Sequence, residues 1–429
     1  MPVYSDLRPD GLTGALLALE GLRNVAVVLN GPTGCRAYHA ATADSQFPRD
    51  AHRPLDFIGE FYFGQSRIPS TYLDNDDYVF GAGEKLKRIL PVIAEAHPAL
   101  IAIVNSPGAA LIGDDLPRLL RRYAPDVPCV AVESTGFSRP AAHGFTEAVK
   151  AVITRLAPDA LPAQPQTVNL LGFSIHHNHW EGSAAELRRL LALCGIQVNA
   201  VLCAGMTAAD LARVPAATCN LVVYDEYGRA LGEWLADRFG TPLFFSPDGA
   251  PVGFAATEFW LQAVCQILGA DPLTALDDLK AARIRSYAAL VRFSALSGLP
   301  KGATFAVRAD ASIACPLTRW LYEYLGMIPL AVQLTSAPDL ESAKLLRAYL
   351  DSIDCAAAWQ TDPVTTTPEI VLADANTIAA IQSQESLVAG VEIGYATRGY
   401  MDVVPKSLLG AQGALYLIEQ IINGLARLA

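Results

Sequence analysis

The sequence predicts an α/β fold built from three Rossmann-like domains with mostly parallel sheets. Short apolar runs alternate with amphipathic segments of helical period along the whole chain. Runs that are apolar throughout, such as Val25–Leu29 and Leu100–Val104, are typical of parallel strands that helices cover on both faces. The chain has 429 residues, which at ~150 residues per domain corresponds to two or three domains. Hydrophobic residues make up 52% of the chain, enough for several large cores.

Periodicity and turn residues place the individual elements. A capping-box pattern at Ser183 and Glu186 predicts a helix that stops at Gly195, and Thr257 is expected to cap another. Further helices are expected over Glu341–Leu350 and Leu408–Leu425, and a long one up to about Ser297. The expected strands are Val25–Leu29, Leu100–Val104, Cys129–Val132, Val168–Gly172, Val198–Leu202, Leu221–Tyr224, Leu243–Phe245, Thr304–Val307, Leu330–Leu334 and Ile370–Leu372.

Two breaks divide the pattern into three parts. The Pro/Ala-rich stretch Ala157–Gln166 separates a first domain, residues 1–160, from a second over residues 165–270. The second break falls near Gly269–Pro272, and residues 271–429 are expected to form a linking helix, a third domain and a C-terminal helix.

Composition excludes several classes of function. The net charge of −11 and the lack of a long Lys/Arg run argue against a nucleic-acid partner, which requires a basic stripe. The first residues show no secretory signal, and no apolar stretch is long enough to span a bilayer, so a cytoplasmic protein without a membrane partner is expected. In such a reducing compartment the eight cysteines are core or metal residues and not a disulfide framework.

The turn Gly31–Cys35 is the strongest candidate for chemistry. It directly follows an expected strand, and ligands collect at the carboxyl ends of parallel strands. Gly31 and Gly34 allow a bulky group to approach, and Cys35 at a helix start lies in a positive dipole field that favours the thiolate. A thiolate is an iron or zinc ligand, whereas a tight turn with a buried cysteine is the alternative. No Gly-Lys-Ser/Thr follows, so the turn is not a phosphate loop.

Three weaker candidates lie in other segments. His176 and His179 are three residues apart in a histidine-rich loop after a strand and can face one metal or a proton path, or form a polar loop at a subunit interface. Cys315 precedes Pro316 at an expected helix start, without a paired ligand nearby in sequence. Cys129, Cys194, Cys203 and Cys265 are interpreted as core residues.

The order of several motifs resembles the nitrogenase component 1 family along essentially the whole chain. This family includes nitrogenase α and β chains, dark-operative protochlorophyllide reductase and methylthio-alkane reductases. The segments that carry the resemblance are Gly31–Cys35, Thr71–Asp74, Val79–Gly81, Glu84–Leu86, Ile112–Asp115, Ser134–Phe137, Asn220–Val222, Arg238–Pro242 and Leu409–Ala414. The family has three Rossmann-like domains, as the residue pattern also predicts.

The resemblance implies an iron–sulfur cluster at a subunit interface, either 4Fe–4S or P-cluster-like. Cys35 matches the middle of the three cysteines that each family subunit typically offers. The first position is Asp10 here, and the third is Ser106 or Pro107. The resemblance therefore implies a metal site made of Cys35, with Asp10 and Ser106 as possible additional ligands, that a partner completes. For Asp10, a plain helix cap is the alternative.

The resemblance also implies partners and a role. Catalytic chains of the family hold a cofactor through a cysteine in the second domain, but Val223–Tyr227 contains none, so this chain resembles the β-type, non-catalytic subunits. It would pair with a homologous catalytic chain in an α2β2-type complex and receive electrons from an ATP-dependent 4Fe–4S reductase. The implied reactions are reduction of dinitrogen, a tetrapyrrole or a carbon–sulfur bond. A scaffold for metallocofactor assembly and a cluster-free partner-binding paralogue are the alternatives.

Overall fold

The computed structural model describes residues 9–47, 67–135, 139–336, 339–384, 387–395 and 402–428. For Thr33 and residues 35–38 it describes the backbone and not the side chains. Part of the segment Ser134–Phe137 therefore lies outside the described residues. The described chain is α/β, and every strand pairing within its sheets is parallel, which confirms the predicted fold class. No described helix combines the length and apolar character needed to cross a membrane.

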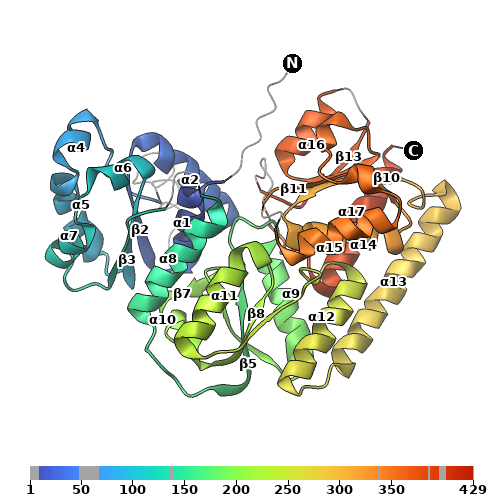
Figure 1. Ribbon diagram of the computed structural model, residues 1–429, viewed down its shortest axis with the longest axis horizontal. Coiled ribbons are helices and arrows are strands. Elements are labelled where there is room, and N and C mark those ends of the chain that lie inside the picture. The colour runs from blue at the N-terminus through green and yellow to red at the C-terminus, as the bar shows by residue number, and fades with distance from the viewer. Residues whose placement is uncertain are drawn as a thin grey trace.

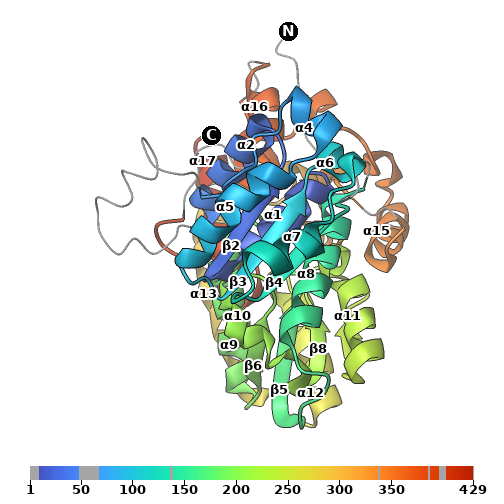
Figure 2. The same cartoon turned by 90° about the vertical axis from the view of Figure 1, so that its left-hand side faces the viewer.

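The first sheet has the strand order β2-β3-β4 and carries helices on both faces (Figure 1). Successive side chains of β2 point to opposite faces of this sheet. Val27 and Leu29 belong to the core under α1 and α8, whereas Val28 belongs to the core under α5 and α7. Figure 2 shows α5 and α7 in front of the sheet. The elements are α1 (Gly11–Glu20), β2 (Val25–Asn30), α2 (Thr33–Gln46), α4 (Asn75–Phe80), α5 (Gly83–Glu95), β3 (Leu100–Asn105), α6 (Pro107–Ile112), α7 (Leu116–Tyr123), β4 (Cys129–Val132) and α8 (Ala141–Leu156).

The second sheet has the order β6-β5-β8-β9. Leu170 and Leu221 face the core under α9 and α12, whereas Leu171 and Val222 face α11 and α8. A short pair, β1 (Leu22–Arg23) with β7 (Met206–Thr207), joins the first sheet's region to the second. The elements are β5 (Gln164–Leu171), α9 (Trp180–Leu193), β6 (Gln197–Val201), α10 (Ala208–Leu211), β8 (Ala217–Val222), α11 (Asp225–Phe239), β9 (Leu243–Phe245) and α12 (Gly253–Leu268).

The third sheet has the order β11-β10-β12-β13. The helices α14, α15 and α17 cover one face, and α16 covers the other. The long helix α13 (Leu273–Ser297) runs beside α17 (Gly410–Ala426), as Figure 1 shows. The remaining elements are β10 (Thr304–Ala309), α14 (Ala311–Glu323), β11 (Ile328–Leu334), α15 (Glu341–Ser352), β12 (Ile370–Ala373), α16 (Ala375–Gln382) and β13 (Ala389–Glu392). The domain boundaries at 160, 165 and 270 stay a prediction.

The contact between α1 and α8 depends on two glycines. A Cβ at Gly14 would lie 1.8 Å from the carbonyl oxygen of Ala141, and a Cβ at Gly144 would lie 1.8 Å from that of Gly11. The two helix backbones are thus in direct contact, and any larger residue would push them apart. This contact positions Asp10, at the start of α1, beside Pro140, at the start of α8.

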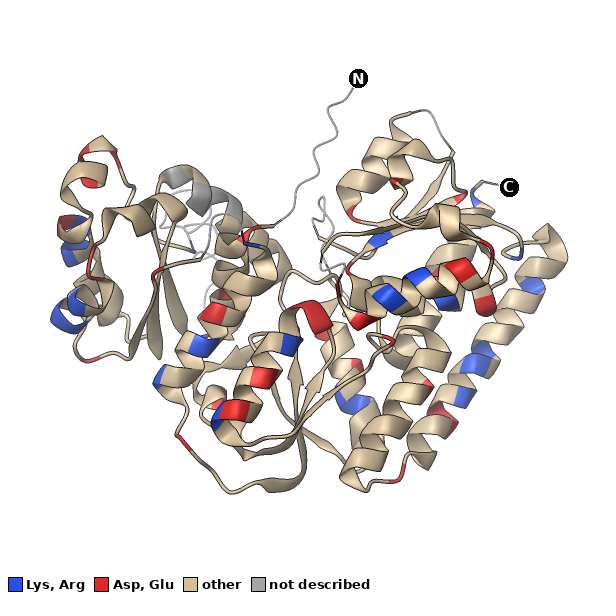
Figure 3. Cartoon of the chain, viewed as in Figure 1, with Lys and Arg blue, Asp and Glu red and all other residues tan. Residues whose placement is uncertain are grey.

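Charges of both signs are interspersed over the helices. Figure 3 shows both Lys or Arg and Asp or Glu on α5, α11, α13 and α15. Mixed surfaces of this kind favour solubility and give no extended field of one sign.

Candidate functional sites

The turn after β2 lies against the start of α6. Gly31 follows β2, and α2 begins at Thr33, so Cys35 is the third residue of that helix. A Cβ at Gly31 would lie 2.9 Å from the Cβ of Ser106, so only glycine permits this approach. Gly34 is exposed, and a Cβ there would meet no described atom within 4 Å. The Cys35 side chain lies outside the described residues.

Buried polar side chains fix the ends of the strands next to this turn. Asn30 donates to the Asn105 side-chain oxygen at 2.9 Å, and the Thr71 hydroxyl donates to the Asn30 oxygen at 2.8 Å. Thr71 also accepts the Gly31 backbone N–H at 3.0 Å. The backbone that precedes Cys35 is therefore held from both neighbouring segments.

Exposed apolar side chains gather beside the turn on α4 and α6. Phe80 is 85% exposed and Leu111 is 88% exposed. The two helices are in contact, since the Tyr78 ring lies against Gly108. We call these residues the α4–α6 surface: Tyr72, Tyr78, Val79, Phe80 and Leu111. Clustered exposed apolar side chains of this kind mark sites of protein–protein contact.

Asp10 and Ser106 both serve as helix caps. The Asp10 carboxylate accepts the Thr13 backbone N–H and hydroxyl, each at 2.9 Å. The Thr13 hydroxyl in turn lies 2.9 Å from His39 of α2, so the start of α1 is adjacent to α2. The Ser106 hydroxyl accepts the Ala109 N–H at 3.3 Å. The structure thus brings Ser106 to the Gly31 turn and Asp10 to the side of α2.

The histidine-rich loop divides between two environments. His176 and His177 pack together with ring centroids 4.3 Å apart. His179 instead forms a 2.7 Å contact with Asp402 and packs against Tyr416. His176 and His179 therefore have separate hydrogen-bond partners, and among the described residues no group of three His, Cys, Asp or Glu side chains is placed to hold a metal ion.

Cys315 lies inside α14 and not at its start. It is the fifth residue of that helix and is fully buried. Burial raises the pKa of its thiol to about 12, so it stays protonated at neutral pH. Cys203 is buried in the same way, and burial raises its pKa to about 12 as well.

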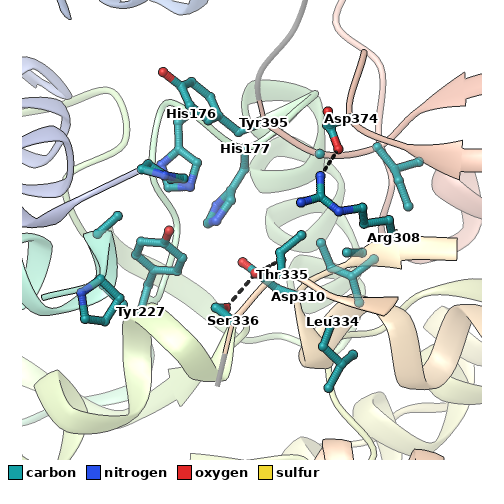
Figure 4. Close-up of a pocket in the computed structure, with 18 of the residues that line it drawn as sticks. His176, His177, Tyr227, Arg308, Asp310, Leu334, Thr335, Ser336, Asp374 and Tyr395 are labelled. Atoms are coloured by element: carbon teal, nitrogen blue, oxygen red, sulfur yellow. Dashed lines mark hydrogen bonds and ion pairs between the residues drawn. The ribbon is translucent and has the colours of Figure 1, made fainter. Parts of the chain in front are cut away.

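A cavity of about 600 Å³ lies between the parts of the chain that contain the first, second and third sheets (Figure 4). Most of its lining residues lie at the carboxyl end of a strand, just after it, or at the start of a helix. Those that matter for chemistry are Asp10 from α1, His176 and His177 after β5, Tyr227 of α11, Arg308 and Asp310 at the end of β10, Asp374 after β12 and Tyr395 after β13.

Hydrogen bonds and burial define the protonation of the cavity wall. The Ser174 backbone N–H donates to His177 Nδ1 at 3.1 Å, so the neutral His177 ring carries its proton on Nε2. Burial lowers the pKa of His176 to about 3 and that of His177 well below its usual value. Burial raises the pKa of Tyr227 well above its usual value. Arg308 forms a buried ion pair with Asp374 at 2.5 Å.

The neutral histidines predict a pH dependence of stability. In the unfolded chain His176 takes up a proton below about pH 6.5, whereas in the folded protein burial delays this to about pH 3. Stability is therefore lost as the pH falls through this window. His176→Gln should reduce the slope of the unfolding free energy against pH by up to ~1.4 kcal/mol per pH unit.

Urea unfolding at a series of pH values measures this slope. His97→Gln, at an exposed histidine between α5 and β3, is the matched control and should keep the wild-type slope. A wild-type slope in His176→Gln would contradict the buried, neutral state of this ring.

The comparison with family models covers almost the whole chain. The model for nitrogenase component 1 type oxidoreductases matches residues 11–426. The chain belongs to this family. A solved structure shows the same fold: nitrogenase Cp1 at pH 6.5 superimposes on this chain with a TM-score of 0.78 at 16% identity, over 100% of this chain and 94% of the other.

Two curated relatives of this nitrogenase component 1 type chain share a name. The B subunit of light-independent protochlorophyllide reductase from Chlorobium phaeovibrioides is 32% identical over 341 residues, which is 72% of this chain and 59% of the relative. The protein of the same name from Roseiflexus sp. is 27% identical over 244 residues, 57% of this chain and 42% of the relative. The chain thus spans about half the length of these curated relatives.

Several cavity residues were not among the candidates from sequence. Arg308, Asp310, Asp374 and Tyr395 lie at or after the carboxyl ends of strands in the third sheet, and Tyr227 lies in α11, which follows β8. The rule that ligands collect at such ends identifies them once it is applied to all three sheets and not chiefly to the first.

Proposed function

We propose that this chain is the electron-transfer and structural subunit of a nitrogenase-like reductase complex. The observation that carries the proposal is the Gly31–Cys35 turn beside the exposed α4–α6 surface. An apolar surface next to a potential thiolate ligand suits an interface at which a homologous, catalytic partner subunit covers the turn and excludes water. Family membership supports an oxidoreductase role.

The residues that the structure describes do not make a complete cluster site. Asp10 and Ser106 are engaged as caps, so each would have to release a hydrogen bond to bind iron. We therefore propose that Cys35 is the one thiolate that this subunit contributes to a 4Fe–4S or P-cluster-like group. The partner subunit would supply most of the other ligands to the iron. The ligand type and the burial of such a cluster set its reduction potential.

Electrons would come from a separate ATP-dependent 4Fe–4S reductase. The sequence contains no phosphate loop, so ATP is expected on that reductase. Among the possible substrates, the names of the relatives favour a tetrapyrrole, and protochlorophyllide is the first to test. Methylthio-alkanes and dinitrogen are the alternatives.

One observation favours a second function, that of a scaffold for metallocofactor assembly. The cavity of about 600 Å³ gives this chain its own space in which a precursor can be held. A scaffold releases its cargo to another protein and does not turn over. A cluster-free subunit that only binds partners is the third alternative.

Anaerobic assay of the purified complex separates these functions. With the ATP-dependent reductase, ATP and protochlorophyllide, the proposed function predicts steady, ATP-dependent reduction, seen as a change in the pigment's absorption spectrum. Omission of ATP is the control. Transfer of a metal cofactor to an acceptor protein without turnover would favour the scaffold, and full activity in an iron-free complex would favour the cluster-free subunit.

A further inference from the structure

A carboxylate that does not cap its own helix lines the cavity at the start of α14. Asp310 follows β10 and occupies the N-cap position of α14, where an aspartate usually accepts a backbone N–H of the first turn. Its side chain makes no such bond, and Glu226 of α11 accepts the Ser312 N–H at 2.9 Å instead. The Asp310 side chain is therefore available to the cavity that it lines (Figure 4).

Two hydroxyl groups hold Asp310 in this position. Its Oδ1 accepts the hydroxyl protons of Thr335 and of Ser336, the latter at 2.6 Å, as Figure 4 shows. Among the residues that the structure describes, none forms an ion pair with Asp310. Asp310 is half-buried, and a charge that is partly removed from water gains more from an opposite charge than one at the surface does.

Asp374 shows the same position in a compensated state. It follows β12, the strand next to β10, and occupies the N-cap position of α16. Its carboxylate accepts the N–H groups of Asn376 and Thr377 and forms the buried ion pair with Arg308 at 2.5 Å. Two aspartates thus stand at the carboxyl ends of adjacent strands. Asp374 caps its helix and is paired with a cation, whereas Asp310 does neither.

The rest of the lining does not balance the charge of Asp310. The charged residues of the lining are Asp10, Asp310 and Asp374 against Arg139 and Arg308. Arg308 is paired with Asp374, and Asp10 and Arg139 lie on adjacent segments, since the Gly11 N–H donates to the Arg139 carbonyl. His176 and His177 add no positive charge at neutral pH, because burial lowers the pKa of both. The lining therefore keeps one negative charge in excess.

Aromatic rings form another part of the cavity wall (Figure 4). His176 packs against Tyr227 with ring centroids 4.9 Å apart and against Tyr395 at 5.6 Å. His177 packs against Tyr227 at 5.1 Å. Burial raises the pKa of Tyr227, and the negative charge of Asp310 raises it further, so that charge acts on this wall. The faces of neutral aromatic rings attract cations.

We propose that this cavity binds an organic ammonium ion, with Asp310 as its counter-ion and the rings of Tyr227 and Tyr395 beside its charged group. The cavity volume of about 600 Å³ has room for a small organic molecule. A metal ion fits less well, because among the described residues no group of three His, Cys, Asp or Glu side chains is placed to hold one.

The site belongs to this chain alone. It requires neither the iron–sulfur cluster nor the partner subunit, so it goes beyond the proposed function and does not rest on it. The lining comes from the parts of the chain that contain all three sheets. A ligand that binds there only in the folded state stabilises the whole chain by mass action.

Calorimetric titration of the full chain at neutral pH tests the preference for a positive charge. Benzylammonium, benzyl alcohol and benzoate share one ring and differ in charge. Benzylammonium should bind and raise the thermal unfolding midpoint, and benzyl alcohol should bind about 10-fold more weakly. Benzoate should bind more weakly still. Equal affinity for benzylammonium and benzyl alcohol overturns the inference. So does the failure of both benzylammonium and benzyltrimethylammonium to bind.

Asp310→Asn tests the counter-ion. The amide keeps an oxygen for the hydroxyls of Thr335 and Ser336 but removes the charge, so the affinity for benzylammonium should fall about 10-fold, to that of benzyl alcohol. Asp115→Asn is the matched control, because it removes the same charge at the exposed N-cap of α7, outside the cavity, and should keep the wild-type affinity. A wild-type affinity in Asp310→Asn overturns the inference.

A second pair of variants tests the ring wall and decides the matter if Asp310→Asn does not fold. Tyr395→Leu removes a ring from the wall and should weaken the binding of benzylammonium more than that of benzyl alcohol. Tyr395→Phe keeps the ring and should bind benzylammonium as the wild type does. A wild-type preference for benzylammonium in Tyr395→Leu overturns the inference.

Discussion

Cys35→Ala is expected to remove the iron–sulfur cluster from the assembled complex. If this thiolate is the subunit's one cysteine ligand, alanine leaves one coordination position of the iron empty. Neither the capping carboxylate of Asp10 nor the capping hydroxyl of Ser106 can fill that position without losing its own hydrogen bonds. We expect the iron and acid-labile sulfide of the purified complex to fall to a small fraction of wild type, and the EPR signal of the cluster to disappear. The loss of electron transfer should follow.

A matched variant separates this effect from general damage. Cys355→Ala replaces a half-buried cysteine in the loop after α15, far along the chain from the turn, and should leave iron content and EPR unchanged. Co-purification of the partner with Cys35→Ala shows that the complex still forms. Wild-type iron content and EPR in Cys35→Ala would exclude Cys35 as a ligand.

Gly144→Ala is expected to cause a large loss of stability. The new methyl group would lie 1.8 Å from the Gly11 carbonyl oxygen, and a backbone atom cannot rotate away as a side chain can. The helices α1 and α8 must separate, and overpacking of this kind costs about 3 kcal/mol. Because Asp10 and Pro140 line the cavity from the ends of these helices, the cavity should also change shape.

Gly34→Ala is the control for this substitution. Both glycines lie in helices, so both variants gain helix propensity, but a Cβ at Gly34 meets no described atom within 4 Å. The unfolding midpoint of each variant is measured by heat or urea. The difference between the two midpoints reports the destabilisation that the steric clash at Gly144 causes. Equal midpoints would show that the α1–α8 contact adapts without cost.

Most of the fold could be predicted from sequence because parallel strands buried on both faces are apolar throughout. Every expected strand overlaps an observed one, and α13 ends at Ser297 as expected. The strands β1, β7 and β13 were missed because two to four residues, such as Ala389–Glu392, carry too little pattern. Their pairing depends on tertiary contacts that periodicity does not report.

Two predicted helix caps were wrong for a physical reason. Ser183 lies inside α9, which begins at Trp180 after His179 in a left-handed conformation. The Ser183 hydroxyl instead accepts the Leu408 N–H at 3.0 Å, and Glu186 accepts the Gln412 N–H at 3.1 Å, so both side chains hold the start of α17. Thr257 lies one turn inside α12 and donates to the Gly253 carbonyl at 2.6 Å. The side chains of a capping-box motif can therefore bond to the start of a distant helix as well as to the start of their own.

The candidate sites were predictable to different degrees. The turn at Gly31 and its neighbour Ser106 follow from adjacent parallel strands, whose carboxyl ends must meet. The spacing of His176 and His179 suggested one shared face, but the left-handed backbone at His179 turns that residue toward Asp402. The cavity is lined by both Tyr227 of α11 and Asp310 after β10, and no local pattern in the sequence reports that residues so far apart in the chain lie at one cavity.

Iron and acid-labile sulfide analysis, performed on this chain alone and on its complex with the homologous partner, tests the shared cluster site most directly. Both samples would be purified anaerobically and compared per mole of chain. We predict little iron or sulfide in the isolated chain, which offers Cys35 without the other ligands, and a stoichiometric cluster in the complex. A stable cluster in the isolated chain, or a complex that is active without iron, would contradict a site that two subunits share.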